Sequence, residues 1–407
     1  MEVRHGYKQT EVGVIPKDWE VRKLSEICSM KSGRGITSAN IDQFSEYPCY
    51  GGNGLRGFTT QFTHDGRYAL IGRQGALCGN VLGVEGRFFA SEHAVVVTGL
   101  PRTDIRWLAY VLGRMRLNQY SESSAQPGLS VTKLLSLDLA FPPTKAEQDA
   151  IAQVLSDADA HIESLEQLIA KKSYLKQGVM QELLTGKRRL PGFVVKTGYK
   201  QTEIGLIAED WEIAHLGSLL TRAPSYGVNA PAISYDSRHP TYLRITDISE
   251  DGRFIDASKV SVKHPLAPGY MLNEGDLVLA RTGASVGKSY LYNRHDGELV
   301  FAGFLIRVSP DSQKLDPSYL KYFLMSGPYW NWVRVNSMRS GQPGINGREY
   351  EALPIPLPPT KSEQEAIATI LSDMDAEIAA LQAKLAKARQ LKQGMMQELL
   401  TGKTRLI

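Results

Sequence analysis

Cysteine is scarce in this sequence. The 407 residues include three cysteines, Cys28, Cys49 and Cys78, and none of them stands in Cys-x-x-Cys spacing. An odd number of scattered cysteines argues against a disulfide framework and against a zinc site. We therefore expect reduced, structural cysteines.

Long hydrophobic runs are also missing. No run of about 18 apolar residues occurs, and the N-terminal stretch MEVRHGYKQTE lacks the apolar core of a signal peptide. Secretion and membrane spanning therefore have no support, and a cytoplasmic protein without a membrane partner is expected. The hydrophobic fraction of 42% and the charged fraction of 22% are typical of a globular protein, and the length allows two or three domains.

A strong excess of one charge is absent. The net charge is +4 and the isoelectric point is about 8.7. Strongly basic nucleic-acid-binding domains usually exceed an isoelectric point of about 9. Charge alone therefore does not identify a nucleic-acid partner.

Catalytic motifs are missing as well. GASVGKS, beginning at Gly283, resembles a phosphate-binding loop, but it has three residues between its glycines where that loop needs four. The sequence has no zincin helix and no paired metal ligands, and its Pro-Pro segments lack the polar and aromatic neighbours of a DNA-methylation loop. We interpret His93 as a structural histidine at a strand edge. A protein that is not an enzyme and that uses no cofactor or metal is expected.

What the sequence does contain is an internal repeat. GYKQTEVG from Gly6 returns as GYKQTEIG from Gly198. The block from Phe141, with PPTKAEQDAIAQVLSDADAHIESL and LKQGVMQELLTGK, returns from Leu357 with PPTKSEQEAIATILSDMDAEIAAL and LKQGMMQELLTGK. Two copies of this length do not make a solenoid. The pattern indicates an internal duplication with a pseudo-two-fold relationship.

Between the repeated blocks, roughly over 28–140 and 220–356, the two halves differ. A common frame remains, since LIGRQGALCGN from Leu70 aligns with VLARTGASVGK from Val278, and QPGLS aligns with QPGIN. In each half, β-rich stretches punctuated by glycine precede a shorter helical stretch. Each divergent region is therefore predicted to be an α+β domain of ordinary size.

Each closing block predicts one long helix. Apolar residues recur in steps of four and three from Ile367 to Ala388, as in a coiled-coil seam. A helix of about 40 residues with one apolar stripe must bury that stripe, so we expect the two helices to pair with each other, in antiparallel orientation. The start and stop signals are Thr144 and Glu147 with Gly186 in the first copy, and Thr360 and Glu363 with Gly402 in the second.

Glycine interrupts both predicted helices at the same place, at Gly178 and Gly394. Glycine inside a helix costs about 1 kcal/mol relative to alanine. Two interpretations are open, a tolerated bend and the close approach of another chain. The second would involve the neighbouring apolar residues Met180, Leu183, Leu184, Met396, Leu399 and Leu400.

Recognition is the function class that remains. Polar side chains on glycine-rich turns can hydrogen-bond the edges of bases, while lysines and hydroxyls hold phosphates. For any single residue, an ordinary solvated side chain is the competing interpretation. The candidate DNA-binding residues are Lys31, Arg34, Asn53, Arg56, Arg73, Gln74, Asn80, Gln126, Arg222, Arg244, Arg281, Thr282, Lys288, Arg339, Gln342 and Arg348.

With its tandem opening and closing blocks, the chain resembles the specificity subunit of type I restriction-modification systems. The resemblance implies two target-recognition domains, each reading one half of a split, asymmetric DNA sequence. It implies two antiparallel helices that separate the domains and act as a ruler. It also implies three partners: double-stranded DNA, two copies of an adenine-methylating modification subunit, and ATP-dependent restriction subunits.

The predicted organisation is α+β with an internal duplication. Three alternatives stay open: a scaffold protein whose domains bind other proteins, the recognition part of another class of restriction-methylation enzyme, and a specificity subunit that no longer directs modification. The expected segments are a first recognition domain over 1–140, a spacer helix over 141–190, a second recognition domain with its linker over 191–356, and a second spacer helix over 357–407.

Overall fold

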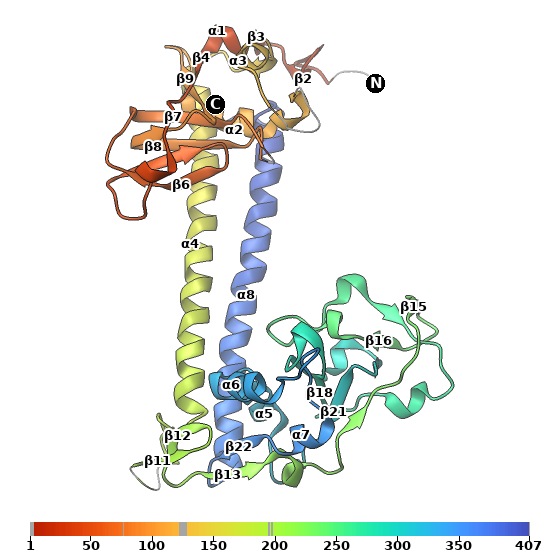
Figure 1. Cartoon of the computed structure of the whole chain (residues 1–407). Helices are drawn as coiled ribbons and strands as arrows, with labels where there is room; N and C mark the ends of the chain where they lie inside the picture. Colours follow the sequence, from red (N-terminus) through yellow and green to blue (C-terminus); the bar gives the residue numbers. More distant parts are fainter. Residues whose placement is uncertain (1–3, 76, 122–127, 194–195, 197, 407) are drawn as a thin grey trace. The chain divides into compact units, whose positions relative to one another are not determined.

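A computed structural model describes residues 4–75, 77–121, 128–193, 196 and 198–406. The chain forms two compact units. The first unit comprises Met1–Gln167 and Gln382–Ile407, and the second comprises Leu168–Leu381. Both units are of the α+β type, as predicted, and each contains one divergent region together with parts of two long helices (Figure 1).

The repeated opening block forms the first three strands of the first unit. Strands β1 (Tyr7–Thr10) and β2 (Gly13–Pro16) make an antiparallel hairpin. Strand β3 (Glu20–Lys23) pairs with β10 (Asp138–Phe141), the last strand before the first long helix. This pairing brings both ends of the divergent region together, so the region closes as one domain.

A six-stranded sheet in the order β4-β9-β7-β8-β5-β6 forms the divergent region of the first unit. Its pairs are antiparallel except β5 with β8. Trp107 and Leu108 of the helix α2 pack against Ile71 and Val97 in one hydrophobic core. The elements are α1 (Leu24–Ile27), β4 (Cys28–Ser32), β5 (Tyr47–Gly51), β6 (Gly54–Thr59), β7 (His64–Gly72), β8 (Val81–Ala90), β9 (Ala94–Gly99), α2 (Ile105–Arg114) and α3 (Val131–Leu135).

The second unit has the same hairpin and the same strand pairing before its long helix. Its opening block forms the hairpin β11 (Tyr199–Thr202) and β12 (Gly205–Ala208), and β13 (Glu212–His215) pairs with β22 (Pro354–Leu357). Its divergent region contains two four-stranded sheets, in the orders β14-β21-β18-β19 and β15-β17-β16-β20.

The remaining elements of the second unit are short. The helix α5 packs Tyr319 and Leu320 against Leu277 and Ile306 of the sheet, as α2 does in the first unit. The elements are β14 (Ser225–Tyr226), β15 (Ile233–Ser234), β16 (Thr241–Leu243), β17 (Val260–Ser261), β18 (Leu277–Ala280), β19 (Ser289–Leu291), β20 (Leu299–Phe301), β21 (Leu305–Val308), α5 (Pro317–Phe323), α6 (Gly327–Asn336) and α7 (Gly347–Glu351).

The two long helices are α4 (Lys145–Leu183) and α8 (Lys361–Leu399), each of 39 residues. The threonine hydroxyls accept hydrogen bonds near both helix starts, from the backbone nitrogen of Glu147 to Thr144 (3.2 Å) and from that of Glu363 to Thr360 (3.3 Å). After the helices, Gly186 and Gly402 adopt φ angles of 67° and 69°. That left-handed conformation favours glycine and ends a helix.

Within each unit, the segments of α4 and α8 run side by side in opposite directions (Figure 1). In the first unit, Glu166 of α4 pairs with Arg389 of α8 at 2.5 Å, and the earlier Asp159 pairs with the later Lys392. In the second unit, Lys172 lies 2.7 Å from Glu377. The predicted antiparallel pair is therefore confirmed. No helix in the described part of the chain is both long and apolar enough to cross a membrane.

Candidate nucleic-acid interface

Several turns of the first unit meet at one edge of its six-stranded sheet. The backbone nitrogen of Arg34, after β4, donates to the oxygen of Ala90 at the end of β8 (2.9 Å). The nitrogen of Arg73, after β7, donates to the oxygen of His93 in the β8–β9 turn (2.9 Å). The end of β5 joins them, since the nitrogen of Ser91 donates to the oxygen of Tyr50 (2.8 Å).

This edge brings together six side chains that could contact DNA. Nη1 of Arg73 donates to the hydroxyl of Ser32 at 3.2 Å. Oε1 of Gln74 lies 3.1 Å from Nδ1 of His93, whose side chain is about half exposed. Arg34 and Asn53 are exposed on the adjoining turns, and Arg56 is exposed on β6. We call this set, Arg34, Asn53, Arg56, Arg73, Gln74 and His93, the first turn cluster.

The second unit builds the same backbone frame from different residues. The nitrogen of Arg281 donates to the oxygen of Phe304 (3.1 Å), as Arg73 does to His93. The nitrogen of Val228 donates to the oxygen of Phe301 (3.0 Å), as Arg34 does to Ala90. The predicted alignment of the two halves therefore extends to the hydrogen bonds of their turns.

In each unit, this backbone frame requires one glycine, because the neighbouring carbonyl oxygens leave no room for a side chain. An added Cβ at Gly33 would lie 2.3 Å from the carbonyl oxygens of Ala90 and Ser91. An added Cβ at Gly227 would lie 2.3 Å and 2.2 Å from the corresponding oxygens of Phe301 and Ala302. Any side chain there would push the neighbouring turns apart.

The side chains of the second frame form the second turn cluster. The guanidinium of Arg281 lies 4.7 Å from the ring centre of Tyr226. Thr282 pairs with Gly344 in an isolated β-bridge, which places it beside the Gln342 turn. We define the second turn cluster as Tyr226, Arg281, Thr282, Phe304 and Gln342.

Four of the other predicted DNA-binding residues of the second unit have partners within that unit. Arg244 forms an ion pair at 2.7 Å with the fully buried Asp247, and Nε of Arg222 donates to Ser309 (3.1 Å). Lys288 pairs with Glu250 and Arg339 pairs with Glu349. Arg348 is exposed on α7. None of these five joins the second turn cluster through a contact between the described residues.

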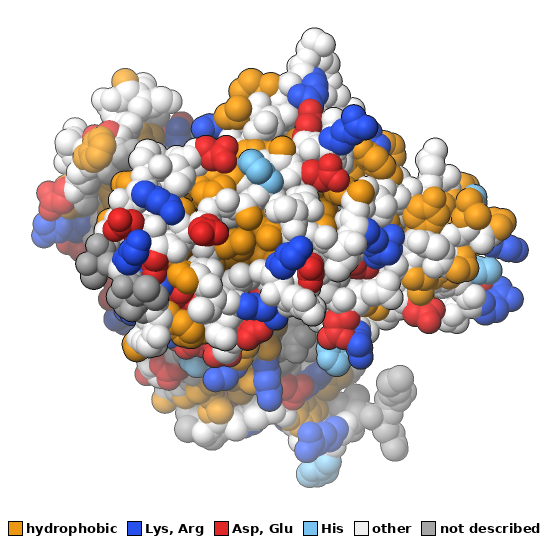
Figure 2. Space-filling view, turned by 90° about the horizontal axis from the view of Figure 1, so that it is seen from below, with side chains coloured by type: hydrophobic (Ala, Val, Ile, Leu, Met, Phe, Trp, Pro, Cys, Tyr) orange, Lys and Arg blue, Asp and Glu red, His pale blue; other side chains and the backbone are white. Residues whose placement is uncertain are grey.

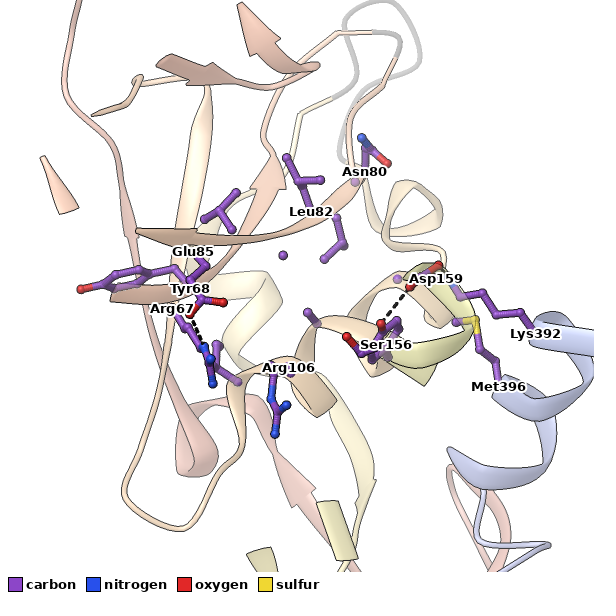
Figure 3. Close-up of a pocket in the computed structure, with 18 residues that line it drawn as sticks. Arg67, Tyr68, Asn80, Leu82, Glu85, Arg106, Ser156, Asp159, Lys392 and Met396 are labelled. Atoms are coloured by element: carbon purple, nitrogen blue, oxygen red, sulfur yellow. Dashed lines mark hydrogen bonds and ion pairs between the residues drawn. The ribbon is translucent and has the colours of Figure 1, made fainter. Parts of the chain in front are cut away.

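The remaining predictions for the first unit lie elsewhere. Lys31 is exposed on β4. Asn80, the residue before β8, lines a pocket of about 660 Å³ bordered by β8, α2, α4 and α8 (Figure 3). Gln126 lies outside the described residues.

The pocket in Figure 3 lies where the divergent region of the first unit attaches to both long helices. Asp159 of α4 and Lys392 of α8 meet at its wall. The hydroxyl of Tyr110 on α2 donates to Oδ2 of Asp159 at 2.8 Å. One carboxylate thus joins three elements.

The same arrangement recurs in the second unit, although the divergent regions differ. The hydroxyl of Tyr322 on α5 donates to Asp375 of α8 at 2.9 Å, and Lys176 of α4 pairs with the same carboxylate. The pKa of Tyr322 is raised, because of burial and of the neighbouring Asp375 charge. We call these sets the docking triads, Tyr110–Asp159–Lys392 and Tyr322–Asp375–Lys176.

The apolar residues predicted to bind a partner lie mainly inside the units. Met180, Leu183 and Leu184 are buried in a core with Trp211, and Leu399 and Leu400 are buried in a core with Trp19. Met396 is partly buried against the second of these cores. Exposed neighbours remain on the helices. Leu175 is 46% exposed and Leu391 is 58% exposed.

Gly178 and Gly394 lie one turn after these exposed leucines. An added Cβ at either glycine would meet nothing within 4 Å in the described part of the chain. No contact among the described residues therefore explains why glycine stands at both positions.

Charge on the visible surface is mixed. Figure 2, which looks from below the view of Figure 1, shows Lys and Arg side chains interspersed with Asp and Glu. This pattern agrees with the small net charge of +4. A DNA contact on this face would rest on individual side chains. A broad positive patch is not seen in this view.

The turn clusters contain three residues that the sequence did not single out as DNA contacts, namely His93, Tyr226 and Phe304. The interpretation of His93 as a structural histidine stays a prediction. The residues of the docking triads were not singled out either, because their partners are far apart in the sequence. The alignment of the two halves gave a usable signal for Phe304, because Phe304 occupies the same place in its turn as His93 does in the first half.

Comparison with known proteins shows the family. The family described as "Type I restriction modification DNA specificity domain" matches residues 16–171 and 209–390, which together make up most of the chain. Each match contains one divergent region and the beginning of the long helix that follows it.

Curated relatives carry names from the same family. A putative type I restriction enzyme specificity subunit, MjaX, of Methanocaldococcus jannaschii is 25% identical, over 98% of this chain and 97% of the relative. The EcoprrI specificity subunit of Escherichia coli is 46% identical, over 37% of this chain and 39% of that protein.

A solved structure has the same fold. The S subunit of a type I restriction-modification system from M. genitalium matches with a TM-score of 0.67 and 15% identity, over 98% of each chain. A likeness at this identity shows the fold alone. With the family match over most of the sequence, it leads to one conclusion: the chain belongs to the type I restriction-modification specificity subunits.

Proposed function

We propose that this chain directs a type I restriction-modification complex to DNA, and that each unit reads one half of a bipartite, asymmetric site. The observation that supports this most is the pair of turn clusters. Both units hold an arginine, Arg73 or Arg281, at the same point of the same backbone frame. Around it the side chains differ, with Gln74 and His93 in one unit and Thr282 and Phe304 in the other.

This combination suits a protein that recognises two different DNA half-sites. An arginine fork can donate two hydrogen bonds to O6 and N7 of guanine, and glutamine can do the same with adenine. A common frame with different neighbouring side chains would present similar geometry but different chemistry to each half-site. Glycine at Gly33 and Gly227 maintains that frame in both units.

In this proposal the long helices set the unread spacer between the half-sites. Each helix has 39 residues, which corresponds to about 58 Å at roughly 1.5 Å per residue. A length of that order corresponds to one to two turns of DNA, at about 34 to 36 Å per turn.

We further propose that the exposed helix faces at Leu175 and Gly178, and at Leu391 and Gly394, dock modification subunits. Two equivalent faces would take two copies of an adenine methyltransferase subunit. Catalysis would then belong to those partners and to ATP-dependent restriction subunits, with this chain as the non-catalytic reader. The complex would act in the cytoplasm.

The experiment is co-expression with the modification subunits followed by mapping of methylated adenines. Arg73→Ala should relax one half-site, and Arg281→Ala the other, each with a loss of about 1 to 3 kcal/mol at one base pair. Arg67→Ala and Arg253→Ala are matched controls, since both arginines are surface ion-pair partners outside the turn clusters.

Two results would contradict the proposal. Unchanged methylation motifs in both variants would remove the arginines from base reading. Binding to duplex DNA that shows no sequence preference and no decrease with rising salt would favour a scaffold protein, because a DNA reader releases counterions and weakens steeply with salt.

A further inference from the structure

Phe304 is a large apolar side chain left in solvent on a polar turn. It lies in the short connection between β20 and β21 and is 61% exposed. Its neighbour on one side, Leu305, is fully buried. Within the described residues, Phe304 joins none of the hydrophobic cores and stacks on no aromatic ring.

The backbone around Phe304 is held in a defined position. Its oxygen accepts from the nitrogen of Arg281 (3.1 Å), and the nitrogen of Leu305 donates to Ala302 (2.8 Å). The nitrogen of Gly303 donates to the oxygen of Val228 (2.9 Å). A ring carried on a turn with these bonds is presented to solvent by a rigid frame.

The first unit has His93 at the same place in its frame. The nitrogen of Ala94 donates to Ser91 (3.0 Å), as that of Leu305 donates to Ala302. His93 contacts Gln74 through its ring nitrogen. The first unit therefore presents a hydrogen-bonding group where the second presents a purely apolar one.

The neighbours of Phe304 indicate what it contacts. Arg281 is stacked on Tyr226 at 4.7 Å, and no hydrogen bond or ion pair to the guanidinium is found among the described residues. An arginine held in this way suits bidentate recognition of a base. In the major groove, the apolar group beside such hydrogen-bonding edges is the C5-methyl group of thymine, which phenylalanine can contact.

We propose that Phe304 contacts the methyl group of a thymine in the half-site of the second unit, next to the base pair read by Arg281. This inference rests on the proposed function and names one base that the second unit recognises. The second unit requires a thymine at that point, whereas the first unit reads the equivalent position through hydrogen bonds from His93 and Gln74.

The test uses the complex with its modification subunits and duplexes that carry the mapped methylation site. Each thymine of the second half-site is replaced in turn by deoxyuridine, which lacks the C5-methyl group but keeps every hydrogen-bonding atom. Removing one buried methyl group weakens binding by about fourfold. The wild-type complex should show this loss at one position.

Variants identify the residue responsible. Phe304→Ala should bind the thymine and deoxyuridine duplexes equally at that position, and so should Phe304→His, which keeps a ring on the turn. Leu266→Ala is the matched control, because Leu266 is also 61% exposed in the second unit but lies outside the turn cluster. It should keep the wild-type discrimination.

Failure of the inference and failure of the proposed function give different results. If the complex prefers the mapped duplex over a scrambled one but ignores every deoxyuridine, or if Phe304→Ala keeps the fourfold discrimination, the thymine contact is overturned. If the wild-type complex shows no preference between mapped and scrambled duplexes, the proposed function itself fails.

Discussion

Arg189 and Glu363 form a buried ion pair, with Nε of the arginine 2.8 Å from Oε1 of the carboxylate. The same guanidinium lies 2.6 Å from Asp210. The three side chains are 9%, 2% and 5% exposed, respectively. One arginine after the end of α4 thus joins the opening block of the second unit to the start of α8.

Arg189→Ala should destabilise the second unit by about 3 to 5 kcal/mol, because it leaves buried carboxylates without their partner. Urea denaturation followed by circular dichroism measures the change. Arg188→Ala is the control, since Arg188 is the exposed neighbour. Equal stability of the two variants would show that the buried pair does not hold the unit together.

The first unit contains the equivalent contact, made by Arg405 with Asp18 and Glu147. Arg189 follows α4, which starts in the first unit, and makes its contacts in the second unit. Arg405 follows α8, which starts in the second unit, and makes its contacts in the first unit. Both arginines and both sets of carboxylates stood in the repeated blocks. Sequence reasoning paired the helices but missed these contacts, because Asp18 and Arg405 are at opposite ends of the chain.

Removing one hydroxyl tests the docking triads. Tyr322→Phe deletes the hydrogen bond to Asp375, and we expect a loss of about 0.5 to 1.5 kcal/mol in unfolding free energy. Tyr110→Phe should behave alike in the first unit. Tyr174→Phe, at a tyrosine that is 78% exposed on α4, should change nothing. Neutral behaviour of all three would mean that the triads do not hold the divergent regions against the long helices.

Helix signals were the most readable part of the sequence. The threonine caps and the glycine stops lie within a few residues of the segment they control, so local chemistry predicts the bounds of α4 and α8. The turn clusters were harder to predict. Arg244 and Arg281 look alike in the sequence, but only the long-range fold pairs Arg244 with the buried Asp247 and leaves Arg281 stacked on Tyr226.

Alanine substitutions at the two helix glycines test the stability of the isolated chain and the assembly of the complex separately. Gly178→Ala and Gly394→Ala should each stabilise the isolated chain by about 1 kcal/mol, because the new Cβ meets open space. If modification subunits dock there, the same variants should form the complex less well in size-exclusion chromatography. Gln177→Ala, at the exposed preceding residue, is the control. Unimpaired assembly of both glycine variants would place docking elsewhere.

The cysteines should be unreactive in the folded chain. All three are buried, and burial raises the pKa of the Cys28 thiol to about 12. Burial also raises the pKa of Cys49 and Cys78. A raised thiol pKa leaves little thiolate at pH 8, and the thiolate is the reactive form. Iodoacetamide should therefore label no cysteine natively and three in denaturant by mass spectrometry. Native labelling at any cysteine would contradict this packing.

The central claim is that helix length sets the distance between two base-reading units. It is tested by inserting seven residues, about two helical turns, into α4 between Gln167 and Leu168 and into α8 between Leu381 and Gln382. Seven residues preserve the heptad pattern. A matched control replaces seven exposed residues with alanine without changing the length.

The measurement is the spacer between half-sites in the adenine methylome of cells that express the lengthened chain with its modification subunits. We predict unchanged half-sites and a spacer longer by up to about three base pairs, since the insertions add about 10 Å and DNA rises about 3.4 Å per base pair. An active complex with an unchanged spacer would contradict the account.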